Sequence, residues 1–302
     1  MMKKYLVILG VATLFFGASL WLYKTNYLSL LLSFTRFSLP SELQGATFIS
    51  DQGAQTIAYP FLRRAEAVPG KLISATNYES GSASIIKRDA TFSVMLDGNT
   101  VLEDTRPRLN ITRSSTGSRI AYAEAEDPSV FVSPADAPLL ANDRSQWKVV
   151  VYEPLTRTSF VLGNGVAPFF VDDTHVAWMA PAGLAIADLT TGTSKVLVPD
   201  IQGRTPTSSL VSPDHSIIGW YSDDAQAIEL YRVSVDTAEP VSVIPLSPKV
   251  ISVTLSNDAL YSISLQSSQS VVMKQSFTDA SPHTIMKLPL GLYVKRLLLG
   301  SI

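Results

Sequence analysis

Short runs of alternating hydrophobic and polar residues dominate the chain after Pro40. Clusters of Gly, Pro, Asp, Asn and Ser separate these runs, a pattern typical of strands joined by turns. The stretch GLAIADLTTGTSKVL, 183–197, contains two such runs and a polar turn that ends in Gly192. We therefore expect one all-β domain over residues 46–302.

One hairpin can be located from its turn. The stretch TFSVMLDGNTVLED, 91–104, has Asp97 and Gly98 at its centre. A two-residue hairpin turn of this kind needs positive φ at both central residues, and Asp-Gly tolerates that geometry well. The sequence therefore predicts two antiparallel strands that meet at this pair.

A repeated unit emerges when four segments are aligned. Each has a strand-like run, a polar turn and an apolar run with an aromatic residue, followed by two further strands, and the segments start at Arg108, Pro168, Ser209 and Ser252. The aromatic residues of the last three, Trp178, Trp220 and Tyr261, lie 42 and 41 residues apart. A unit of 40–45 residues with four short strands is typical of a β-propeller blade. A single blade cannot bury both of its faces, whereas a closed ring of blades can.

The number of blades is estimated from the residues that precede and follow the four repeats. The repeats span about residues 107–288, and residues 46–105 leave room for one more blade. The last residues, LYVKRLLLGSI, look like an opening strand with no successor, which strands within residues 46–60 could complete. We therefore favour six blades, with five or seven as alternatives. The first repeat also carries a long insertion, residues 126–147, and long loops of this kind are often functional.

Two motifs resemble the WD40-like repeats of TolB-type β-propellers. VSPDHSIIGW, 211–220, matches the Ser-Pro-Asp-Gly turn and the apolar strand after it, with His215 where glycine is usual. IADLTTGTSKVL, 186–197, matches the aspartate strand that leads to a Thr-Gly turn. The resemblance implies a rigid ring that binds other proteins.

The N-terminus carries a long apolar segment. After MMKK, residues 1–4, the chain from Tyr5 to Tyr23 has no charged residue. A helix of this length spans about 28 Å, which is close to the thickness of the hydrocarbon core of a membrane. We expect a signal anchor that contacts the bilayer through Tyr5–Tyr23. A cleaved signal peptide and a buried helix of a soluble protein are the alternatives.

The anchor predicts where the protein resides. Lys3 and Lys4 place residues 1–4 in the cytoplasm under the positive-inside rule, so the propeller would lie outside, in the periplasm or at the cell surface. The protein would then cross the cytoplasmic membrane once. Residues 24–45 would form a linker or a membrane-proximal helix, lying either on the bilayer or against the domain that follows.

Composition excludes several kinds of chemistry. The chain has no cysteine, which removes disulfides, thiolate metal sites and cysteine nucleophiles. The net charge is −2, so nucleic-acid binding is not expected. Of the three histidines, His175 and His215 fall at similar turn positions of neighbouring repeats, and we expect them, like His283, to be exposed and far apart.

No motif predicts catalysis. The pairs Asp172-Asp173 and Asp223-Asp224 lack the spacing of a calcium loop, so we expect turn aspartates that bond their own backbone. ESGSAS at Glu79 lacks the second glycine of a serine-hydrolase motif, and SDQGAQT, 50–56, lacks the tryptophan of a sialidase box. We expect no catalytic residue, cofactor or metal.

The favoured function is a non-catalytic scaffold that binds other envelope proteins. A glycan-active envelope hydrolase with a site at the mouth of the central channel and a structural subunit of an oligomeric surface assembly are the alternatives.

Charge is unevenly distributed along the chain. Four arginines, 106, 108, 113 and 119, follow one another without an acid, whereas residues 172–239 hold ten acids against three bases. One side of the ring could therefore be basic and the other acidic. The candidate partner-binding residues come from this arginine run and from the insertion: Phe131, Asp136, Asp143, Arg144, Trp147, Arg106, Arg108 and Arg113.

Overall fold

The computed structural model describes most of the chain after residue 39. The described residues are 40–43, 46–50, 53–58, 61–64, 71–78, 81–129, 144–199, 204–222, 226–247, 249–267, 269–279, 281–288 and 294–299. None of the helices in these ranges is long and apolar enough to cross a membrane. The predicted anchor, Tyr5–Tyr23, and most of the predicted linker, 24–45, lie outside them.

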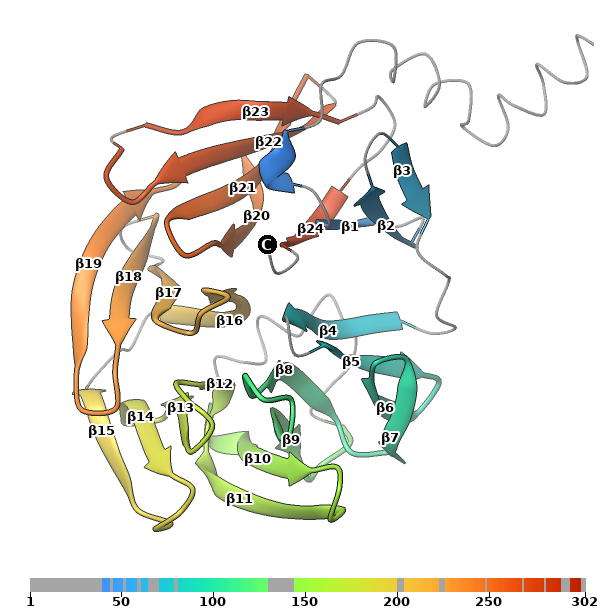
Figure 1. Ribbon diagram of the computed structural model, residues 1–302, viewed down its shortest axis with the longest axis vertical. Coiled ribbons are helices and arrows are strands. Elements are labelled where there is room, and N and C mark those ends of the chain that lie inside the picture. The colour runs from blue at the N-terminus through green and yellow to red at the C-terminus, as the bar shows by residue number, and fades with distance from the viewer. Residues whose placement is uncertain are drawn as a thin grey trace, which may run out of the picture.

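The described strands form six four-stranded antiparallel sheets arranged around a common axis (Figure 1). Five sheets each use four consecutive strands, and the remaining sheet joins the last strand to the first three. This arrangement confirms the predicted all-β propeller.

Of the five sheets built from four consecutive strands, the first two along the chain contain the predicted hairpin and the insertion. They consist of β4 (Lys71–Tyr78), β5 (Gly81–Arg88), β6 (Thr91–Leu96), β7 (Asn99–Asp104), β8 (Arg108–Arg113), β9 (Ile120–Ala125), β10 (Trp147–Glu153) and β11 (Thr158–Asn164). The other three consecutive sheets consist of β12 (Val166–Phe170), β13 (His175–Ala180), β14 (Gly183–Asp188), β15 (Ser194–Pro199), β16 (Arg204–Val211), β17 (Ile217–Ser222), β18 (Ala227–Val233), β19 (Ala238–Pro245), β20 (Val250–Leu255), β21 (Ala259–Gln266), β22 (Gln269–Ser276) and β23 (His283–Lys287).

The remaining sheet closes the ring with both ends of the chain. It consists of β24 (Val294–Leu298), β1 (Thr47–Ser50), β2 (Gly53–Ala58) and β3 (Phe61–Arg64). Phe48 of β1 pairs with Leu297 of β24, which confirms the closure expected from the sequence. Residues 46–105, expected to hold one blade, hold one complete sheet and three strands of another. The short helix η1 (Ser41–Leu43) precedes β1.

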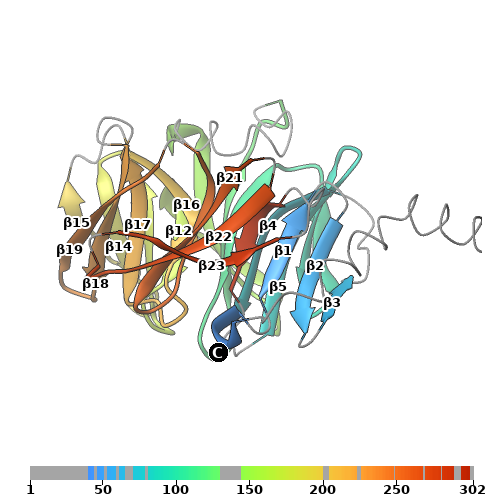
Figure 2. The same ribbon diagram turned by 90° about the horizontal axis from the view of Figure 1, so that it is seen from above.

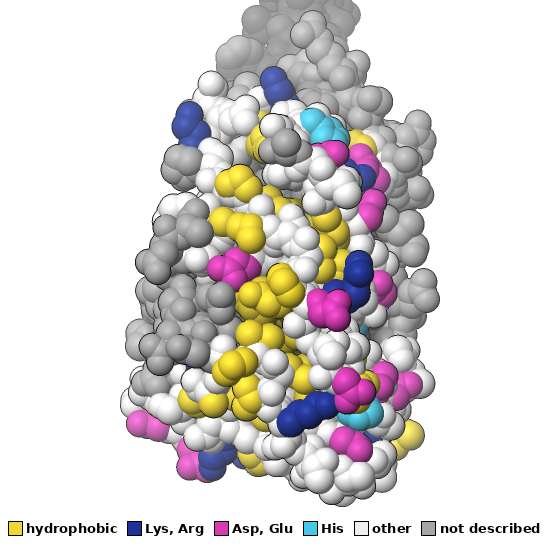
Figure 3. Space-filling view, turned by 90° about the vertical axis from the view of Figure 1, so that its left-hand side faces the viewer, with side chains coloured by type: hydrophobic (Ala, Val, Ile, Leu, Met, Phe, Trp, Pro, Cys, Tyr) yellow, Lys and Arg dark blue, Asp and Glu magenta, His cyan; other side chains and the backbone are white. Residues whose placement is uncertain are grey.

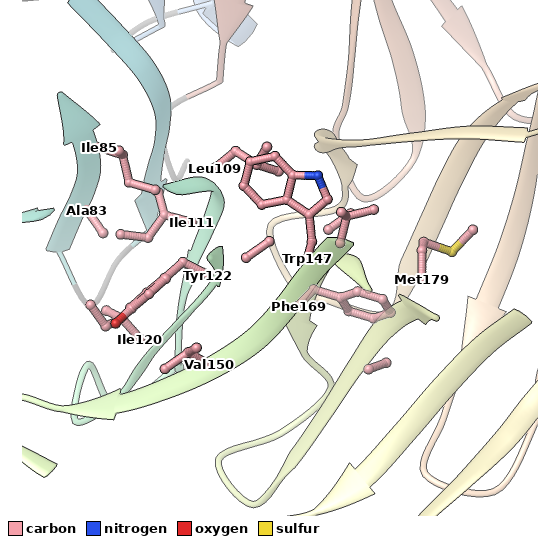
Figure 4. Close-up of a cluster of buried hydrophobic side chains, with 14 of the residues drawn as sticks. Ala83, Ile85, Leu109, Ile111, Ile120, Tyr122, Trp147, Val150, Phe169 and Met179 are labelled. Atoms are coloured by element: carbon pink, nitrogen blue, oxygen red, sulfur yellow. The ribbon is translucent and has the colours of Figure 1, made fainter. Parts of the chain in front are cut away.

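The aromatic residues of the repeat lie between neighbouring sheets. Trp178, Trp220 and Tyr261 are each 3% exposed or less, as expected for residues that pack one blade on the next. The largest core cluster runs through the sheets from β4 to β19, and Figure 4 shows its part around Trp147 and Tyr122. Burial of a large apolar side chain contributes about 1.5–3 kcal/mol, so this repeated packing stabilises the ring.

Two glycines explain sharp changes of chain direction. Asp97 and Gly98 have φ of 48° and 81° and join β6 to β7, which confirms the predicted hairpin. Gly165 joins two sheets with φ of 147°. A Cβ at this position would lie 2.4 Å from the carbonyl oxygen of Met179, so only glycine fits here without displacing the backbone.

The ring has two ends that differ in their connections. One end, the turn face, carries the turns between the first and second strands of the sheets, including residues 114–119, 171–174, 212–216 and 256–258. The other end, the insertion face, carries the connections between the second and third strands, including the described ends of the insertion, residues 126–129 and 144–146, between β9 and β10. Figure 2 shows the ring from the side, with its two ends at the top and the bottom.

Candidate protein-binding face

The insertion leaves the ring through a neck that is fixed on both sides. Trp147, the first residue of β10, is fully buried, and its carbonyl oxygen accepts a hydrogen bond from Gly165 at 2.8 Å. Glu126, just after β9, forms an ion pair with Lys148 across the base of the insertion. Asp127 accepts a hydrogen bond from the backbone N–H of Ser129 at 2.8 Å. The described ends of the insertion are therefore held in place by the sheet beneath them.

A second contact ties the neck to the next sheet. Arg144 opens the short helix η2 (Arg144–Gln146) and is 8% exposed, and its Nη1 lies 3.5 Å from the carbonyl oxygen of Ala180 at the end of β13. Arg144 and Trp147, predicted to bind a partner, instead form the buried base of the insertion. The other three predicted insertion residues, Phe131, Asp136 and Asp143, lie outside the described residues.

Next to the neck, a cluster of four charged side chains fills the space between two sheets. Arg108, whose side chain is 1% exposed, donates to Asp104 at 2.7 Å and to Glu124 at 2.8 Å. Arg106 also contacts both acids, at 2.8 Å and 2.6 Å. Arg108 Nη1 further lies 3.4 Å from the carbonyl oxygen of Phe92 in the preceding sheet. Two cations and two anions therefore neutralise one another between the blades.

The surroundings of this cluster keep its charges fixed. Burial opposes ionisation of Asp104, but hydrogen bonds from Arg108 and Arg106 outweigh it and hold the pKa of Asp104 below its ordinary value. Burial raises the pKa of the adjacent Tyr122 to about 12. The Arg108 guanidinium lies 5.5 Å from the centre of the Tyr122 ring, in a cation–π contact. Within this junction, the lowered pKa of Asp104 and the raised pKa of Arg108 keep that pair charged at neutral pH.

The other two arginines of the run are paired as well. Arg113, which is 8% exposed, contacts Asp97 at 2.9 Å, and Arg119 contacts Glu153 at 2.7 Å. Each of the four arginines therefore has an acid beside it, supplied either by the adjacent strand or by the neighbouring sheet, so the run does not form an unpaired basic side. Of the three predicted partner-binding arginines, only Arg106 has a half-exposed side chain, at 52%.

The turn face is held together by hydrogen bonds between turns of neighbouring sheets. Asp173 accepts hydrogen bonds from the hydroxyl of Ser115 at 3.0 Å and from the backbone N–H of Thr116 at 3.2 Å. Asn257 accepts one from the backbone N–H of Asp214 at 3.1 Å. Asp172 bonds its own turn at the N–H of Thr174, as predicted, whereas Asp173 bonds the neighbouring turn instead. Asp223 and Asp224 lie outside the described residues.

The histidines differ from one another in their surroundings. His215 is 6% exposed, with φ of 60°, and its ring is hydrogen-bonded to the backbone of Phe170 in the neighbouring sheet. The expectation that it is exposed is wrong, because its turn packs against the next blade. Burial lowers the pKa of His215 below its ordinary value. His175 bonds Asp172 at 2.9 Å, and His283 is exposed.

The contacts of the described side chains explain how the sheets of the ring are held together, and they indicate no particular reaction. No group of three or more His, Cys, Asp or Glu side chains that could hold a metal occurs in the part of the chain that the structure describes. The convergent charges around Arg108 are paired, and Arg108 and Glu124 are buried, so their role is to join two sheets. Sequence reasoning missed the neck, although the apolar run WKVVVYE, 147–153, indicated that Trp147 starts a buried strand.

Comparison with known proteins identifies the architecture. No family model and no curated protein matches the sequence. Among solved structures, TolB from Acinetobacter baumannii is 9% identical with a TM-score of 0.59, over 87% of this chain and 68% of that chain. An oligogalacturonate lyase in complex with manganese is 10% identical with a TM-score of 0.54, over 83% of this chain and 76% of that chain. A chain of a nidogen/laminin complex is 10% identical with a TM-score of 0.54, over 85% of this chain and 99% of that chain. The chain is thus a β-propeller whose structural neighbours include TolB.

Proposed function

We propose that this protein is a membrane-anchored extracytoplasmic β-propeller that binds other envelope proteins through its insertion face, without catalysis. The observation that carries the proposal is the fixed neck beneath residues 130–143. The insertion is held at its base by a buried tryptophan and an ion pair, so its remaining residues start from a defined position on the ring. Binding residues concentrate in loops that a rigid scaffold positions in this way.

The position of η1 supports an orientation of the ring. Glu42 accepts hydrogen bonds from Lys274 at 2.5 Å and from the Tyr261 hydroxyl at 3.3 Å, and Leu43 is fully buried. Tyr261 and Lys274 pair with each other near the turn-face ends of β21 and β22. The segment that follows the proposed anchor therefore joins the ring nearer the turn face. An anchored ring would direct its insertion face away from the bilayer.

The test is capture of partners from membranes with and without the insertion. Residues 130–143 are replaced by a short Gly-Ser linker, which keeps Glu126, Arg144 and Trp147 in place. We expect the variant to keep its thermal unfolding midpoint and to lose the proteins that co-purify with the full chain. Capture of the same proteins in the same yield would contradict the proposal.

The anchor is tested separately by replacing residues 1–23 with a signal peptide that is cleaved, so that the shortened chain is still exported. We expect the full chain to sediment with membranes and to resist extraction at high salt, whereas the shortened chain remains in the soluble extracytoplasmic fraction. A shortened chain that still sediments with membranes would contradict anchoring by this segment.

A further inference from the structure

The sulfur atoms of this protein are all in methionines, because the chain has six methionines and no cysteine. Four of these methionines lie in described strands, and their surroundings differ. Met179 is fully buried and Met286 is 6% exposed, each within a core cluster of apolar side chains. Met95 is 9% exposed. Met273, in β22, is the one of the four that is not buried.

The sulfur of Met273 lies next to two hydrogen-bond donors. Ser264 Oγ lies 3.4 Å from Met273 Sδ, and Gln266 Nε2 lies 3.9 Å from it. Gln266 Nε2 also donates to Ser264 Oγ at 3.4 Å, so the amide, the hydroxyl and the sulfur form one chain. A thioether is only a weak acceptor, whereas the oxygen of a methionine sulfoxide is polar and accepts such donors well.

The three residues share one face of their sheet. Met273 lies opposite Ser262 of β21, and Leu260, Ser262, Ser264 and Gln266 alternate along that strand, so all five side chains are on the same side. Leu260 belongs to a core cluster that contains residues of β17 and β18, so this face packs against the sheet β16–β19. Figure 3 shows the rim of the ring that carries these two sheets, where hydrophobic side chains are bordered by charged ones.

Met95 is the comparison within the same molecule. Thr100 Oγ1 donates to its sulfur at 3.0 Å, which is closer than either donor at Met273, but Met95 is buried. Oxidation of Met179 or Met286 would place a polar oxygen inside an apolar core cluster and disrupt its packing. Met273 is therefore the described methionine that combines access for an oxidant with donors for the product.

We infer that Met273 is a site of reversible oxidation by hydrogen peroxide, and that Ser264 and Gln266 hold the resulting sulfoxide. In this step the sulfur lone pair attacks one peroxide oxygen and the O–O bond breaks. The proton on the transferred oxygen passes to the departing hydroxide, which leaves as water. Sulfur is oxidised by two electrons and the peroxide is reduced by two. The methionine side chain is unbranched and flexible, so it can turn its new oxygen towards the two donors.

Peptide mass mapping of the full chain tests the order of oxidation. The protein in detergent is treated with a limiting amount of hydrogen peroxide, and the sulfoxide fraction is measured at each methionine. We expect several times more sulfoxide at Met273 than at Met95, Met179 or Met286, and similar fractions at all four when the chain is unfolded in urea. Methionine sulfoxide reductase should restore Met273. A fraction at Met273 no higher than at Met95 in the folded chain would overturn the inference.

A second measurement tests the donors. The chain oxidised at Met273 should keep its thermal unfolding midpoint, because the new oxygen is hydrogen-bonded. Gln266→Leu should lower the midpoint only after oxidation, and the matched control, Gln266→Leu with Met273→Leu, should not respond to peroxide. An equal change on oxidation with and without Gln266→Leu, or no change in either protein, would contradict the role of the donors. Neither measurement depends on partner capture by residues 130–143, so the two proposals fail independently.

Discussion

The two faces of the ring use polar side chains differently. At the turn face, Asp173, His215 and Asn257 each bond the backbone or side chains of a neighbouring sheet, so adjacent turns are joined one to the next. At the insertion face, the ion pairs between described residues lie around Arg108 and the neck of the insertion. The comparison indicates that the turn face keeps the ring rigid, and that the insertion face fixes the described ends of the insertion. The predictions below test this difference, from the largest expected effect to the smallest.

Trp147→Ala is expected to have the largest effect on stability. The side chain is fully buried at the base of the insertion, and truncation of a buried tryptophan costs about 3–5 kcal/mol. Urea unfolding followed by circular dichroism measures the loss. The matched control replaces residues 130–143 with a linker and should change the free energy of unfolding by well under that amount. Equal losses would show that the insertion itself, and not its neck, stabilises the ring.

Arg108→Met should come next. It leaves Asp104 and Glu124 in a buried junction with only Arg106, and removing one partner of a buried ion pair typically costs about 3 kcal/mol. Arg119→Met removes a partly exposed pair with Glu153 and should cost less than about 1 kcal/mol. The same urea titrations compare the two variants. Similar losses would contradict the view that the polar contacts at the insertion face are concentrated at Arg108.

Asp173→Ala tests the contacts between turns. It removes acceptors for Ser115 and Thr116 of the neighbouring sheet and should cost about 1 kcal/mol, the usual net contribution of an intramolecular hydrogen bond. Faster hydrogen exchange at Thr116 and the residues near it, but not at the neck, is the accompanying readout. Unchanged exchange at this turn would argue against a role for Asp173 in joining the blades.

The smallest expected effect is on pH dependence. The pKa of folded His215 lies below that of the unfolded chain, so the unfolded state binds more protons and the free energy of unfolding falls as pH drops below about 6.5. His215→Asn, which tolerates the positive φ, should remove this loss between pH 7 and 5. Both proteins should still lose stability near pH 4 and below, where Asp104 and Asp214, whose pKa values are lowered in the folded state, take up protons. Equal slopes between pH 7 and 5 would contradict the assignment to His215.

Much of the fold could be predicted because its signals are local. The aromatic repeat, the Asp97-Gly98 turn and the unpartnered last strand each depend on residues close together in sequence, and the structure confirms all three. The pairing of charges could not be predicted in the same way. Glu153, on the adjacent strand, is 34 residues from Arg119, and Asp97, in a turn of the neighbouring sheet, is 16 residues from Arg113, so a linear charge count shows neither pair.

The candidate site was predicted less well for the same reason. Trp147 and Arg144 lie at the end of a long insertion, and that position in the sequence does not show whether a side chain faces solvent or the sheet. The turn position of His215 predicts exposure, whereas in this propeller its turn packs against the next blade. Whether these side chains face solvent depends on contacts between neighbouring blades. Those contacts form only when the whole ring is assembled.

The central claim is that partners bind the insertion face, and photocrosslinking in membranes tests it most directly. A photoreactive amino acid replaces Pro128, exposed in the neck of the insertion, or Pro282, another exposed proline, on the turn face. The account predicts that the Pro128 variant captures a discrete envelope protein and that the Pro282 variant does not. Capture of that protein from Pro282 and not from Pro128 would contradict it.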